Sequence, residues 1–427
     1  MDAVLLLIAF FFFVLIGAPI AYAMGMAALF GAYWIGIPQE AIMIQISSGI
    51  AKFSLLAIPF FVLAGAIMAE GGMARRLVDF ANVLVGFMRG GLAVVNVVAS
   101  TFFAGISGSS VADTSAIGSV LIPQMVKAGY PRLFAVNVTI SGSLQALLIP
   151  PSHNMVLYSL AAGGSISVAS LFLAGIVPGL LLGASIIAYI LVIAYKKDYP
   201  KGEAIPFRQA LTIAGEATWG LGTMIIILGG ILTGVFTATE AAAVACVYSF
   251  LVTMLVYRDY KWSELPHLIH RVVKTVSMVM MLIAFASAFG YIVALMQLPA
   301  RAAEFFLTLS NNKYVILMLI NILLLILGCL MDMAPLILIC TPILLPIMVK
   351  LGVDPVHFGI IMIVNLGIGL LTPPVGSVLF VGCAVGKVTI EEVTRTIWPF
   401  YLVMFAVLML VTYVPAISLG LPKLFGM

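Results

Sequence analysis

The sequence predicts an all-α polytopic membrane protein, built as an inverted repeat with two re-entrant hairpins and two broken helices. Three observations lead to this prediction: the composition, an internal repeat, and helix breakers inside apolar segments. Of the 427 residues, 63% are hydrophobic and 8% are charged, whereas about a quarter of the residues of a soluble protein are charged. Most of the chain is therefore expected to lie in a lipid bilayer.

Crossing a bilayer takes about 20 predominantly apolar residues, and nine segments satisfy this condition. They are 3–35, 53–70, 133–162, 170–195, 216–236, 238–257, 275–297, 356–386 and 396–417. With the N-terminus inside, fifteen of the twenty Lys and Arg residues lie on the cytoplasmic side, as the positive-inside rule requires. Only Lys52, Arg301, Lys313, Lys350 and Lys423 are expected outside. The stretch after Met1 and Asp2 lacks a basic region and a cleavage site, so no signal peptide is expected.

The sequence also repeats itself. An offset of 223 residues pairs Gly105 with Gly328 and Pro150-Pro151 with Pro373-Pro374 without a gap. The same offset pairs the segment 123–129 with 346–352. Five predicted crossings separate the halves, and because five is odd, the second half is expected to be inverted relative to the first.

The best-matched residues of the repeat are helix breakers. They predict hairpins over 91–128 and 313–350, and helices interrupted at Pro150-Pro151 and Pro373-Pro374. Unsatisfied backbone groups in hydrocarbon cost several kcal/mol, so such segments are expected to line a cavity. Proline frees a backbone carbonyl, and transporters use freed carbonyls and half-helix ends to hold ions and solutes. A pair of ordinary proline kinks is the alternative interpretation.

These elements divide the chain into four parts. They are scaffold spans with a first interface arm (1–90), a first transport half (91–195), scaffold spans with a second arm (196–312), and a second transport half (313–427). The arms, at 73–87 and 299–309, are amphipathic and are expected to lie along the membrane surface, although plain connectors would have the same pattern.

Two aspartates are candidates for function because ionisable residues inside a membrane are rare. Asp113 follows the first hairpin tip and Asp332 lies at the second; either could instead cap a helix. Hydroxyl groups surround Asp113, and a site of hydroxyls and carbonyls suits a hard monovalent cation. Cys246, Cys329, Cys340 and Cys383 lie in apolar segments and are expected to be packing thiols. No basic face indicates nucleic-acid binding.

The motifs 105–114 (GISGSSVADT), 149–152 (IPPS) and 367–376 (GIGLLTPPVG) resemble those of the large membrane (M) subunit of tripartite ATP-independent periplasmic (TRAP) transporters. The resemblance covers essentially the whole chain. It implies a symporter of the bacterial inner membrane, driven by sodium ions, without an organic cofactor, and working by an elevator motion. It also implies two partners, a small membrane (Q) subunit and a periplasmic substrate-binding (P) protein.

The resemblance further implies two sodium sites. The first would use Ser107, Ser110 and the carbonyls around Ala146, Ile149 and Pro151, and the second Gly328, Gly369, Thr372 and Val375. The expected solute-binding residues are Ser109, Asp113, Ser152, His153, Asn154 and Asp332. The pair His153-Asn154 resembles the sialic-acid branch of the family, but dicarboxylates remain candidates. His153 could alternatively be a helix-start residue bonded to a carbonyl.

Other classes of function fit less well. The segment 105–108 reads as the Gly-x-Ser-Gly of rhomboid-type proteases, with His153 as a conceivable base, and two membrane aspartates occur in intramembrane aspartyl proteases. Neither class explains the inverted duplication, so the protein is not expected to be an enzyme. A passive organic-anion channel differs by lacking coupling to an ion gradient.

Overall fold

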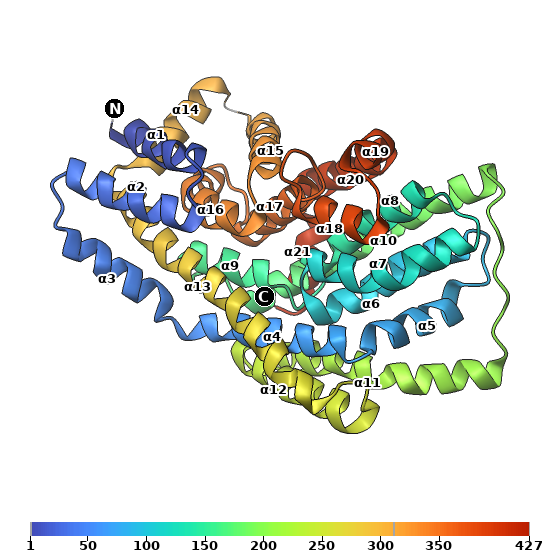
Figure 1. The fold of residues 1–427 in the computed structure, drawn as a ribbon. Helices are drawn as coiled ribbons and strands as arrows, with labels where there is room; N and C mark the ends of the chain where they lie inside the picture. Colours follow the sequence, from blue (N-terminus) through green and yellow to red (C-terminus); the bar gives the residue numbers. More distant parts are fainter. Residues whose placement is uncertain (1, 311, 427) are drawn as a thin grey trace.

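A computed structural model describes residues 2–310 and 312–426, and in these residues the fold is helical apart from one isolated bridge between Arg89 and Lys201. Figure 1 shows the hairpins and broken helices on one side of α4, α11, α12 and α13. The helices of the first half are α1 (Asp2–Leu15), α2 (Ile20–Trp34), α3 (Gln39–Ile50), η1 (Phe53–Leu56), α4 (Ala57–Glu70), α5 (Met73–Val85), α6 (Gly91–Ser107), α7 (Ser110–Lys127), α8 (Arg132–Gly142), η2 (Ser143–Leu147), α9 (His153–Ala161) and α10 (Val168–Lys196).

The second half follows the same plan. Its helices are α11 (Phe207–Leu232), α12 (Ala238–Leu251), η3 (Val252–Tyr257), η4 (Trp262–Glu264), α13 (Leu265–Leu295), α14 (Leu298–Leu309), α15 (Lys313–Leu330), α16 (Met333–Lys350), α17 (Pro355–Gly369), α18 (Ser377–Gly386), α19 (Ile390–Thr396), α20 (Trp398–Tyr413) and α21 (Ala416–Leu424). Both bounds of α16 follow those of α7 at the 223-residue offset, as does the start of α17 relative to α8. The repeat is thus present in the element boundaries, while the inversion stays a prediction.

The predicted single span over 3–35 is wrong, because this segment forms two helices. Gly17 has a φ of +90° and Pro19 precedes α2, so the chain turns between α1 and α2. A Cβ on Gly31 would lie 2.9 Å from Leu6 Cδ1, so the end of α2 meets the start of α1. The two helices therefore pack side by side as an antiparallel pair (Figure 1).

Helix α3 lies in the segment 36–52, for which no element was predicted; it packs on α13, and α4 follows it through η1. Among the described residues, seven helices are long and apolar enough to cross a membrane, or eight if the bent pair α19–α20 counts as one span. Five of the seven coincide with predicted crossings, the bent pair coincides with a sixth, and the other two are the limbs α15 and α16 of the second predicted hairpin. The predicted crossings 3–35, 133–162 and 356–386 consist of shorter helices.

Both predicted hairpins are helix pairs with the expected bounds. In the first, α6 packs on α7, with the turn at Gly108 and Ser109. In the second, α15 packs mainly on α17 and α16 mainly on α9 and α14, so the limbs lie further apart. The predicted arms are the helices α5 and α14.

Candidate functional site

Four helices begin at one place, where the hairpin tips meet the breaks of the interrupted helices. Gly108, at the first tip, lies against the Pro151 carbonyl. Asp332, which precedes α16, accepts a hydrogen bond of 3.1 Å from the Ser377 hydroxyl at the start of α18. His153, the first residue of α9, interacts electrostatically with Asp332 and lies against the Gly108 backbone. The N-termini of α7, α9, α16 and α18 therefore converge.

Each hairpin rests on a break through its main chain, which explains glycine at these positions. Gly108 has a φ of +58°, and a Cβ there would lie 2.3 Å from the Pro151 oxygen. In the second half, a Cβ on Gly369 would lie 2.7 Å from the Gly328 Cα. The Val375 amide also donates a 3.1 Å hydrogen bond to the carbonyl of Cys329, next to Gly328.

The first predicted ion site contains a hydroxyl pair whose hydrogen positions follow from the contacts. The oxygens of Ser110 and Ser143 lie 2.8 Å apart. Ser143 donates its proton to the Ile140 carbonyl at 2.9 Å, so Ser110 must be the donor of the pair. The lone pairs of the Ser110 oxygen are then available to a cation.

The break beside Ser110 is anchored to the first hairpin by Gln145. Its amide nitrogen donates to the Val97 carbonyl at 3.2 Å, and its side-chain oxygen accepts from the Thr101 hydroxyl at 2.7 Å. Ala146 and Ile149, which follow, form a buried cluster with Ala104 of α6. Their carbonyls are thereby held near the end of α6 where Ser107 lies.

The second predicted ion site has one hydroxyl group. Thr372 donates its proton to the Ile368 carbonyl at 2.9 Å, and its hydroxyl group also interacts with the side chains of Cys329 and Tyr401. The Tyr401 hydroxyl donates to the adjacent Leu371 carbonyl at 2.6 Å. The break is therefore stabilised both by Tyr401 and by short local backbone hydrogen bonds such as that from the Thr372 amide to the Gly369 carbonyl.

The predicted solute-binding residues differ in how far their side chains are exposed to solvent. Asp332 is exposed, His153 and Ser109 are half-buried, and Ser152 and Asn154 are buried. Ser109 also accepts the Ala112 amide at the start of α7, so it has a capping role. Asp332 has no such hydrogen bond, so it does not cap α16 through its side chain.

Asp113 lies apart from this group, at 0% exposure one helical turn beyond Ser110. It interacts with Ser100 of α6, and its oxygens lack a hydrogen bond of ordinary geometry. The structure therefore gives a solute no access to Asp113 in this conformation.

Sequence reasoning missed Ser143, Gln145, Ser377 and Tyr401, which position the two breaks. Their proximity to the two Pro-Pro pairs was the available signal for the first three. Tyr401 is distant in sequence, and no local signal indicates its role.

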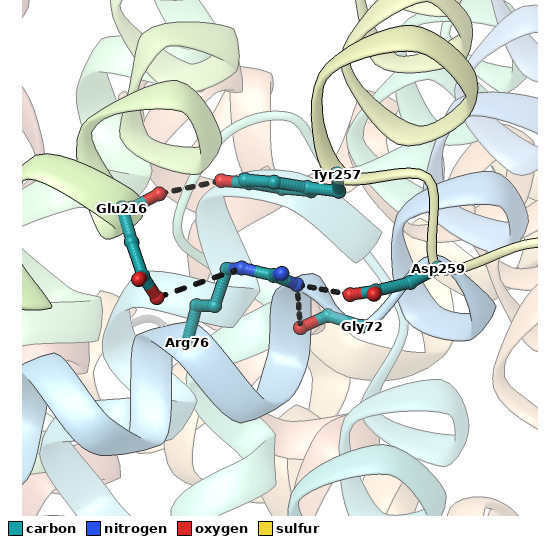
Figure 2. A network of polar contacts seen from close by, with 5 residues as sticks. All are labelled: Gly72, Arg76, Glu216, Tyr257 and Asp259. Carbon is teal, nitrogen blue, oxygen red and sulfur yellow. Dashed lines mark hydrogen bonds and ion pairs between the residues drawn. The ribbon is translucent and has the colours of Figure 1, made fainter.

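A polar network connects α5, the first predicted arm, to α11 of the predicted scaffold (Figure 2). Arg76 of α5 donates to Asp259 at 2.5 Å and to the Gly72 carbonyl at 3.1 Å, and its guanidinium lies 3.8 Å from the centre of the Tyr257 ring. The Tyr257 hydroxyl donates to the Glu216 carbonyl at 2.6 Å. The start of α5 is therefore fixed to α11 and to the segment between η3 and α13, while its other end leads into the first hairpin.

Comparisons with known proteins identify relatives over nearly the full length. Residues 7–417 match the family model described as "Tripartite ATP-independent periplasmic transporter, DctM component". The C4-dicarboxylate TRAP transporter large permease protein DctM of Pseudomonas aeruginosa is 46% identical, covering 88% of this chain and 87% of that protein. The sialic acid TRAP transporter large permease protein SiaM of Vibrio cholerae is 40% identical, covering 89% of each.

Two further matches extend this picture. The isethionate TRAP transporter permease protein DctMQ of Oleidesulfovibrio alaskensis is 40% identical over 96% of this chain and 65% of its own length. The crystal structure of the Alcanivorax borkumensis YdaH transporter superposes with a TM-score of 0.64 at 15% identity, covering 90% of this chain and 89% of that one. At 15% identity, the similarity to the YdaH transporter concerns the fold alone.

Proposed function

This chain belongs to the DctM component family of tripartite ATP-independent periplasmic transporters, and from this premise we propose that it imports a small organic acid together with sodium ions. As a large permease subunit it is a multi-pass protein of the bacterial inner membrane and not an enzyme. Transporters of this family depend on a substrate-binding protein.

The convergence of four helix N-termini is the observation that carries the proposal for an acid. Helix N-termini bear partial positive charge and favour anions. The relatives are named for C4-dicarboxylates, sialic acid and isethionate, all of which carry an acidic group. His153 and Asn154 favour the sugar acid, whereas the Pseudomonas relative favours a C4-dicarboxylate as second candidate. Uptake of one labelled acid, measured in the presence of an excess of the other acid without label, distinguishes the two candidate solutes.

The hydroxyl oxygens of Ser110 and Thr372, each at a predicted ion site, support sodium as the coupling ion. Hydroxyl and carbonyl oxygens are ligands that suit a hard cation. Uptake by the elevator motion that the family resemblance implies would carry both ions and the solute within the hairpins and broken helices.

Ser110→Ala and Thr372→Val are each expected to raise the sodium concentration for half-maximal uptake about tenfold, because a ligand to a charged group is lost. The measurement is uptake into proteoliposomes across a series of sodium gradients. Ser119→Ala is the matched control, since this exposed hydroxyl bonds only to its own helix. An unchanged sodium requirement in both variants, at normal expression, would reject the ligand assignment. Uptake without any sodium gradient would favour a channel.

The chain alone is expected to transport little, because two partners are missing. The relative named DctMQ is longer than this chain, in agreement with a small-subunit partner. Adding that subunit and the periplasmic binding protein to proteoliposomes should restore uptake. Full activity of the isolated chain would contradict the three-part assembly.

A further inference from the structure

A cavity of about 220 Å³ separates the scaffold helices α3 and α13 from α9 and α16. Its walls are largely small or apolar, and Lys52 is the single ionisable residue that lines it. Ser287 of α13 is the one hydroxyl in the lining. The electrostatic potential in this cavity is therefore set by a positive charge.

Lys52 is exposed and directly precedes η1 and α4, which together are long and apolar enough to cross a membrane. The α13 residues that share the cavity with it, from Ile283 to Gly290, lie in the middle of the predicted span 275–297. The cavity therefore extends from Lys52 toward the middle of that predicted span. Among the described residues, no ion pair or side-chain hydrogen bond involves Lys52, so its ammonium group can contact a ligand in the cavity.

The cavity lies along the helices that start at the candidate solute site. Leu160 of α9 and Leu338 of α16 line it, and these helices begin at His153 and Met333. At a rise of 1.5 Å per residue, Leu160 lies about 10 Å and Leu338 about 8 Å from the converging N-termini. A solute moving between the scaffold and these two helices would pass Lys52.

We propose that Lys52 binds the acidic group of the solute, a carboxylate or sulfonate, in this cavity on its way to the converging helix N-termini. The inference rests on the proposed function in taking an organic acid as the solute. An ammonium group is a point charge that does not demand one planar geometry, which fits both kinds of acid.

The first test does not depend on transport. The purified chain in nanodiscs of neutral lipid is treated with an amine-acylating reagent, and modification of Lys52 and Lys350 is followed by mass spectrometry. Lys350 is the matched control because it is predicted on the same side and lies outside the cavity. Succinate, isethionate or sialic acid should slow acylation of Lys52 several-fold and leave Lys350 unchanged. Equal acylation of Lys52 with and without each acid would overturn the proposal. Protection of Lys52 by anionic lipid alone would also overturn it, because the occupant of the cavity would then be a lipid phosphate.

The second test uses the complete transporter. Lys52→Ala should raise the solute concentration for half-maximal uptake about tenfold, as expected for a lost charged contact, whereas Lys52→Arg and Lys350→Ala should stay near the wild type. An unchanged value in Lys52→Ala would refute the role of Lys52. If the wild-type complex takes up none of the acids, the proposed function fails, and the acylation result still decides the binding role of Lys52.

Discussion

Gly369→Ala is expected to reduce sodium-coupled uptake about tenfold to a hundredfold, since overpacking of a fitted contact costs about 1–3 kcal/mol. The new methyl group would lie 2.7 Å from the Gly328 Cα and 2.8 Å from its oxygen, which are backbone atoms that cannot rotate away. The second hairpin would have to move off the break. Because both glycines belong to the second predicted ion site, the sodium requirement should rise together with the loss of uptake.

Gly229→Ala is the control for this substitution. Gly229 is also inside a helix, but a Cβ there meets nothing within 4 Å. Alanine favours helix by roughly 0.5–1 kcal/mol relative to glycine, so uptake should be unaffected. Normal uptake and normal sodium dependence in Gly369→Ala would mean that the contact between Gly328 and Gly369 is not part of the ion site.

A disulfide between Gly105→Cys and Met224→Cys is expected to arrest transport. A Cβ on Gly105 would lie 3.6 Å from the Met224 Cβ, which is within the range for disulfides. This pair joins the first hairpin to α11 of the scaffold, across the boundary where an elevator must slide. Uptake should stop on oxidation and return on reduction, in a background without the four native cysteines.

The control disulfide joins two elements of the predicted moving unit. A Cβ on Gly382 of α18 would lie 3.7 Å from the Ile140 Cβ of α8, so a cysteine pair at these positions should form and be tolerated. The opposite pattern, with transport surviving the scaffold disulfide and lost on oxidation of the control pair, would indicate local gating around a stationary site.

The sequence predicted those elements that local chemistry determines. Glycine and proline limit the backbone wherever they occur, so the hairpin turns and the breaks at Pro150-Pro151 and Pro373-Pro374 were found at the right residues. The span 3–35 was wrong because its apolar content hides the turn at Gly17 and Pro19. Helix α3 was missed because Gln39, Glu40 and Gln45 interrupt its apolar pattern.

The candidate site was predicted less completely, because contacts between distant helices complete it. The tip hydroxyls were recognised from their position beside the breaks. Gln145 and Tyr401 were not, since their hydrogen bonds to Val97 and Leu371 exist only after the helices pack. Asp113 was grouped with the solute residues, and only the packing of α6 on α7 reveals that it faces inward.

The helix boundaries that the two halves share indicate that the chain arose by gene duplication. A duplicated gene begins as two identical copies, and α7 and α16 have kept the same bounds at the 223-residue offset. Their side chains have nevertheless diverged, since Ser110 corresponds to Met333 and Asp113 to Leu336. The predicted ion site of the first copy has a hydroxyl-rich tip, whereas that of the second copy consists of backbone oxygens and Thr372. We therefore expect the two predicted ion sites to differ in affinity and to fill in a defined order.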